Sequence, residues 1–117
     1  MERDEAVAVR TQHLARPGRR AVVVRDLASL RGPARGTVVL PLWLYWSPPG
    51  RVFDLGKPHS LQAMYQFVLG EADNAEDLTA HLNADLLAAV WPNLFLPKGV
   101  RRAWEEHHPE LCAGAAA

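Results

Sequence analysis

The sequence contains little cysteine, little lysine and no long apolar run. Its 117 residues include one cysteine, Cys112, so an internal disulfide is impossible and a reducing compartment fits the chain best. No apolar run reaches the roughly 18 residues that a membrane-spanning helix needs, and no hydrophobic signal core follows the charged first residues. We therefore expect a cytoplasmic protein that does not enter the membrane.

The charges are unevenly distributed along the chain. Two of the 13 basic residues are lysines and the others are arginines, while the formal net charge is zero. Residues 1–35 carry eight arginines against four acids, whereas residues 36–117 carry five basic residues against nine acids. A basic arm of this kind can bind nucleic acid or the acidic part of its own chain. Composition leaves both interpretations open.

The pattern predicts one small domain between two disordered ends. Residues 1–20 show no clear period, and RPGRR at 16–20 breaks any regular element, so we expect a disordered basic arm there. The alanine-rich residues 112–117 are expected to form a disordered tail. Residues 21–111 remain as a single domain that is long enough to bury a core.

The longest apolar segment predicts a β-hairpin. Residues 37–46, TVVLPLWLYW, are apolar on both alternating faces, and such a strand needs cover on both sides. Pro41 removes a backbone donor, which places the strand at a sheet edge or splits it at a bulge. The turn SPPG follows, and residues 52–55 can pair back. We therefore expect a short hairpin over about residues 37–55.

The apolar period becomes helical after Pro58. One predicted helix face carries five apolar residues: Leu61, Met64, Tyr65, Val68 and Leu69. Asn74 and Asn83 each precede an acidic first turn, so they predict the N-caps of two short helices at roughly 75–82 and 84–91. A last helix is expected at about 98–108. The predicted fold class is α+β, with the hairpin packed against three to four short helices.

The last predicted helix carries its charges in the order opposite to the one that a helix dipole favours. Lys98, Arg101 and Arg102 lie at its start, and Glu105 and Glu106 lie at its end. One interpretation is internal pairing of Arg101 with Glu105 and of Arg102 with Glu106, which contributes roughly 0.2–0.5 kcal/mol per pair. The other is a cationic helix start that binds a phosphate or an acidic partner.

The sequence contains no recognisable catalytic, metal-binding or cofactor-binding constellation. His107 and His108 stand beside two glutamates, but adjacent residues on a helix point about 100° apart and cannot easily share an ion. Cys112 has no positioned base, which a nucleophile requires. We therefore expect no catalytic residue, no metal and no cofactor, and we expect that the protein is not an enzyme.

Three aromatic residues of the hairpin are candidates for binding another protein. Trp43, Tyr45 and Trp46 can form part of the core, but one face of an apolar edge strand can also stay uncovered and become an interface. Tryptophan and tyrosine are frequent anchors of such contacts. The predicted partner-binding residues are Trp43, Tyr45, Trp46, Lys98, Arg101 and Arg102.

Four segments of the chain resemble a family of small actinobacterial proteins. They are RDLASLRGP at 25–33, VLPLWLYWS at 39–47, FDL at 53–55 and WPNLFLPKGVRRAWEE at 91–106. The resemblance covers about residues 25–111. Some members are encoded beside nucleotidyltransferase toxins of the abortive-infection type, so the resemblance implies an antitoxin-like or regulatory role toward such a toxin. The family offers no catalytic motif to carry over.

Two functions follow from these expectations. The first is a protein-interaction module that uses the hairpin edge and the helix around residues 98–104. The second is a DNA-binding regulator that uses the arginine-rich arm and the pair Arg101 and Arg102 on phosphates. We prefer the first because no helix-turn-helix signature with an exposed basic helix is evident, and residues 36–117 are net acidic.

Overall fold

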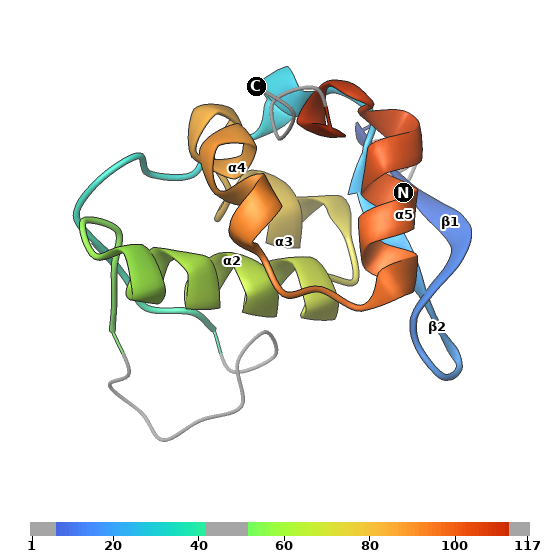
Figure 1. The fold of residues 1–117 in the computed structure, drawn as a ribbon, viewed down its shortest axis with the longest axis horizontal. Coiled ribbons are helices and arrows are strands. Elements are labelled where there is room, and N and C mark those ends of the chain that lie inside the picture. Colours follow the sequence, from blue (N-terminus) through green and yellow to red (C-terminus); the bar gives the residue numbers. More distant parts are fainter. Residues whose placement is uncertain (1–6, 42–51, 113–117) are drawn as a thin grey trace.

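The computed structural model describes residues 7–41 and 52–112, which form an α+β fold (Figure 1). Its strands make two antiparallel pairs: β1 (Ala8–Arg16) with β2 (Arg19–Val24), and β3 (Thr37–Val38) with β4 (Phe53–Asp54). The helical elements are η1 (Leu27–Ser29), α2 (Pro58–Glu71), α3 (Ala75–Thr79), α4 (Ala84–Val90), η2 (Trp91–Asn93) and α5 (Lys98–His107). The predicted fold class is confirmed.

The hairpin of β1 and β2 corrects the prediction that residues 1–20 form a disordered arm. β1 is a nine-residue strand paired along β2, and residues 1–6 lie outside the described part of the chain. The buried residues of β1 are small, namely Ala8, Thr11 and Ala15. They are spaced by three and four residues because the register shifts within the strand. Neither an alternating period nor a hydrophobic run therefore marks this strand in the sequence.

Helix α5 holds β1 in place. Figure 1 shows α5 lying alongside the hairpin of β1 and β2, and it contacts both strands. Val100, Ala103 and Trp104 form the buried face of α5. Gly99 brings the first turn of the helix against the backbone of β1, so closely that a Cβ atom would lie 1.9 Å from the carbonyl oxygen of Leu14. The position therefore requires glycine for steric reasons.

The helices agree with the sequence pattern. The five residues predicted to face the core are the buried residues of α2. Asn74 caps α3 by accepting a hydrogen bond from the N–H of Asp77, and Asn83 caps α4 by accepting from the N–H groups of Asp85 and Leu86. Within the described ranges, no helix has the length and apolar character needed to cross a bilayer.

The second strand pair is shorter than the predicted hairpin. β3 and β4 pair over two residues each, and Val38 and Phe53 face the core from opposite strands. Val39 points the other way, with 61% of its surface exposed. Among the described residues, the face of this strand pair that carries Val38 and Phe53 is therefore buried, and Val39 on the other face is exposed. Residues 42–51, which include the predicted turn, lie outside the described residues.

Candidate interaction surface

Phe95 is the most exposed large apolar side chain among the described residues. It lies between η2 and α5, where Leu94 is buried and Phe95 is 89% exposed. Its backbone N–H donates a 2.7 Å hydrogen bond to the side-chain oxygen of Gln66 on α2. Sequence reasoning missed Phe95. The available signal was its place in the extended run Leu94–Leu96 between two prolines, where alternate residues face opposite sides.

Arg101 fixes the base of the same loop. Its guanidinium lies 5.0 Å from the centre of a Trp91 ring, which allows a cation–π contact. It donates to the carbonyl oxygens of Trp91 and Leu94, and it forms the predicted ion pair with Glu105 at 3.4 Å. The structure thus places the guanidinium of this predicted partner-binding residue in internal contacts that connect α5 to η2.

Lys98 and Arg102 have a different setting. Both are exposed, and neither side chain forms a hydrogen bond or an ion pair with another described residue. The predicted pairing of Arg102 with Glu106 is not formed, because Glu106 instead contacts His13 of β1 at 2.9 Å. The hydrogen bond with His13 lowers the pKa of Glu106 below its ordinary value. Lys98 and Arg102 therefore remain available as exposed cations on α5.

Glu105 is the acceptor at the centre of these internal contacts. Its carboxylate accepts a 2.9 Å hydrogen bond from the indole N–H of Trp91 and is paired with Arg101. Partial burial alone would raise the pKa of Glu105, but the hydrogen bonds from Trp91, Cys112 and Arg101 and the charge of Arg101 lower it overall. Glu105 thus remains ionised and helps to fix Arg101 in its position.

The second strand pair adds apolar surface near α2. Extending its register by one residue places Val39 opposite Val52, and both are exposed. Behind them, Phe53 is buried, and its ring lies 6.2 Å from that of the partly exposed Phe67. Phe67 follows Gln66, the residue that holds the loop of Phe95. The exposed large apolar residues of the described ranges are Val39, Val52, Phe67, Phe95 and, on β1, Leu14.

The predicted hairpin also carries three aromatic candidates for partner binding. Trp43, Tyr45 and Trp46 lie outside the described residues. Their predicted role in partner binding therefore stays a prediction. The segment that contains these three residues connects Pro41, two residues after Val39, to Val52.

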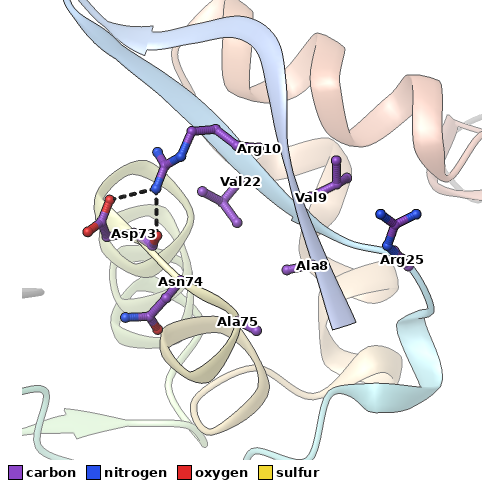
Figure 2. A pocket seen from close by; sticks show the side chains of 8 residues that line it. All are labelled: Ala8, Val9, Arg10, Val22, Arg25, Asp73, Asn74 and Ala75. Carbon is purple, nitrogen blue, oxygen red and sulfur yellow. Dashed lines mark hydrogen bonds and ion pairs between the residues drawn. The ribbon is translucent and has the colours of Figure 1, made fainter. Parts of the chain in front are cut away.

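A hollow of about 430 Å³ lies between β1 and the start of α3 (Figure 2). Arg10 stands at its edge and donates to both the backbone oxygen and the carboxylate of Asp73, at 2.8 and 2.9 Å. Asn74 is engaged in capping α3, and Ala8 and Val22 supply apolar lining. The lining combines small apolar side chains with the ion pair of Arg10 and Asp73. Arginine stays protonated, so this pair is not a general acid–base pair.

The histidines of the described ranges are mostly held by the fold. His81 and His107 contact backbone oxygens one turn earlier, and the buried His108 donates to the carbonyl oxygen of Val24 at 2.7 Å. In residues 7–41 and 52–112, no three side chains of histidine, cysteine, aspartate or glutamate lie close enough to hold a metal ion. These contacts give the histidines structural roles.

No family model, curated protein or solved structure matches this chain. The resemblance of its four segments to small actinobacterial proteins thus remains a prediction. Its function has to be argued from the geometry of the surface.

Proposed function

We propose that this protein is a non-enzymatic protein-interaction module. Its binding surface consists of Phe95, Lys98 and Arg102, extended by the predicted hairpin residues Trp43, Tyr45 and Trp46. The observation that carries the proposal is the position of Phe95, a large aromatic side chain that is 89% exposed on a loop fixed from both sides. Exposed aromatic side chains and exposed arginines are both typical of protein interfaces, where aromatic residues and arginine are enriched.

Two hydrogen bonds within the chain hold the backbone of the loop of Phe95. The N–H of Phe95 is held by Gln66, and the carbonyl oxygen of Leu94 is held by Arg101. A partner would therefore lose little free energy in ordering this segment, because its backbone is already fixed. Burial of a phenylalanine side chain contributes about 1.5–3 kcal/mol, which is enough to make Phe95 a binding hot spot.

The surface sets requirements for its partner. An apolar socket must receive Phe95, and carboxylates must approach Lys98 and Arg102, which are exposed and form no hydrogen bond or ion pair with another described residue. The family resemblance suggests a nucleotidyltransferase toxin as this partner and hence an antitoxin-like role. We place the interaction in the cytoplasm, since the single cysteine suits a reducing compartment.

The hairpin gives less support to the alternative of a DNA-binding regulator with a basic arm. Arg10, Arg16 and Arg19 form ion pairs with Asp73 and Glu71 of their own chain. Arg101 is likewise engaged with Glu105. These pairs agree with the interpretation that the basic half of the sequence binds its own acidic half.

The proposal is tested by affinity capture with the full chain and three variants. We expect that Phe95→Ser and the double variant Lys98→Gln/Arg102→Gln lose a specific partner that the unchanged protein retains. Arg31→Gln, which also removes an exposed cation but lies outside this surface, is the matched control and should retain the partner. Equal capture by all four proteins would contradict the proposed surface.

The antitoxin-like role needs a separate test. The protein is co-expressed with the product of the neighbouring gene, and growth and complex formation are measured. An antitoxin should form a complex with that product and relieve its toxicity, and Phe95→Ser should weaken both effects. A neighbouring product that is neither bound nor toxic would contradict the antitoxin role while leaving the interaction surface to the capture experiment.

A further inference from the structure

The tip of the hairpin of β1 and β2 gathers four arginines around one hollow. Its volume is about 500 Å³, and its charged lining consists of Arg10, Arg16, Arg19, Arg20 and Asp73. Gly18, at a φ of 78°, forms the tight turn that brings Arg16 opposite Arg19. The arginines come from both strands, so formation of the hairpin is what assembles the cluster.

The acids of the fold neutralise this cluster only in part. Arg10 and Arg19 share one carboxylate oxygen of Asp73, at 2.9 and 3.5 Å, and Arg16 is paired with Glu71 at 3.2 Å. Figure 2 shows the guanidinium of Arg10 turned toward Asp73. Two carboxylates thus pair with three of the four arginines, and no ion pair is formed by Arg20 within the described residues. The excess positive charge is concentrated where the guanidinium groups already lie close together.

Two further observations show unused donor capacity. The Nε atom of Arg19 is buried and has no hydrogen-bond partner among the described residues, so the contacts of the fold do not use every donor of this guanidinium. The exposed side chain of Arg20 makes no hydrogen bond or ion pair with another described residue. Meanwhile the contacts to Asp73 and Glu71 hold the other guanidinium groups in fixed orientations, which reduces the ordering needed to bind a ligand.

We propose that this hollow binds a compact phosphate-bearing anion. Guanidinium groups match phosphate oxygens through paired hydrogen bonds, and an anion in the hollow would relieve the mutual repulsion of the arginines. The four arginines line one hollow together with Asp73, and all four belong to a single hairpin. A cluster confined to one hairpin favours a compact polyphosphate group over an extended nucleic-acid backbone. The site is separate from the surface of Phe95.

The test measures binding of inorganic tripolyphosphate to the full chain by calorimetry at low salt. We expect saturable binding that weakens with added salt. Arg20→Gln should reduce the affinity about tenfold, because it removes a charge-assisted contact from a side chain that is not needed by the fold. Arg31→Gln removes the same charge from an exposed residue outside both surfaces and should leave the affinity within about twofold.

Asp73→Asn gives a second, opposite expectation. It keeps the shape of the side chain but removes the negative charge that competes with the ligand, so tripolyphosphate should bind several-fold more tightly. The proposal is overturned by an absence of saturable binding, by equal losses in the Arg20 and Arg31 variants, or by weaker binding to Asp73→Asn. Binding of a short DNA duplex without binding of tripolyphosphate would likewise overturn it.

Discussion

Replacement of Gly99 by alanine tests how α5 is seated on β1. The added Cβ would lie 1.9 Å from the carbonyl oxygen of Leu14, and side-chain carbon atoms do not approach backbone atoms closer than 3.0 Å. Helix α5 would therefore have to withdraw from β1 by roughly 1 Å, and a gap of this size forfeits about a quarter to a half of the dispersion energy at the affected contacts. The buried side chains of Val100, Ala103 and Trp104 would share this loss.

The expected free-energy change follows from two opposing effects. Overpacking costs about 1–3 kcal/mol or more, while alanine in place of glycine stabilises a helix by about 1 kcal/mol. The steric effect is larger because the obstructing atom belongs to the backbone and cannot rotate away. With the steric cost at the upper end of its range, we expect Gly99→Ala to lower the free energy of unfolding by about 1–2 kcal/mol and the melting temperature by about 5–10 °C.

Gly70 provides a matched control for this substitution. It also lies in a helix, α2, but a Cβ there would meet no atom within 4 Å. Gly70→Ala should therefore raise the free energy of unfolding by about 0.5 kcal/mol. Urea denaturation of both variants measures the two effects. A Gly99→Ala protein as stable as Gly70→Ala would refute the close packing of α5 on β1, and with it the order of the first strand.

Three further substitutions probe the contacts around α5. Arg101→Lys should lower the free energy of unfolding, measured in urea, by about 1–3 kcal/mol. The reason is that lysine lacks the planar group that contacts Trp91 and donates to two carbonyl oxygens. A loss below about 0.5 kcal/mol would argue against this role. The pKa of Glu105 is lowered in the folded state, so the ionised carboxylate stabilises the fold. This stabilisation is fully present at a pH above the ordinary carboxyl pKa. It is lost as the pH falls through the lower pKa of the folded protein. Denaturation at several pH values should show unchanged protein losing more stability than Glu105→Gln below about pH 4.3, and parallel curves would contradict the assignment. His108→Phe removes the buried donor to Val24 and should cost about 1 kcal/mol or more in thermal unfolding; an unchanged melting temperature would show that this hydrogen bond contributes little.

The helices could be predicted from the sequence because their signals are local. The buried face of α2 follows directly from the spacing of its five apolar residues, and Asn74 and Asn83 cap the helices that follow them. The pairing of Arg101 with Glu105 likewise depends on residues one turn apart. In each case the residues that make the contact lie within a few positions of one another along the chain.

The first strand could not be predicted because its stabilising contacts are distant in sequence. The buried side chains of β1 are small, and the strand is held by β2 and by α5, including the contact of Leu14 with Gly99. Its charges gave a misleading signal. Arg10 and Arg16 suggested a solvated arm, whereas they pair with acids more than 50 residues away.

The candidate surface was predicted only in part. The exposed cations Lys98 and Arg102 follow from the helical period, but the inward position of Arg101 depends on Trp91 and Leu94 of the preceding segment. Phe95 was missed because an apolar residue between two leucines resembles a core residue. Its exposure results from the hydrogen bond to Gln66 and from the extended backbone, which turns it away from its buried neighbour Leu94.

The most direct test of the proposed function is the dissociation constant of the captured partner for unchanged protein and for Phe95→Ser. We predict that the substitution weakens binding about 10- to 100-fold, as expected for loss of a buried phenylalanine side chain. The melting temperature should not change, because the side chain makes few contacts within the fold. An unchanged dissociation constant would contradict the assignment of Phe95 as the anchor of the interaction.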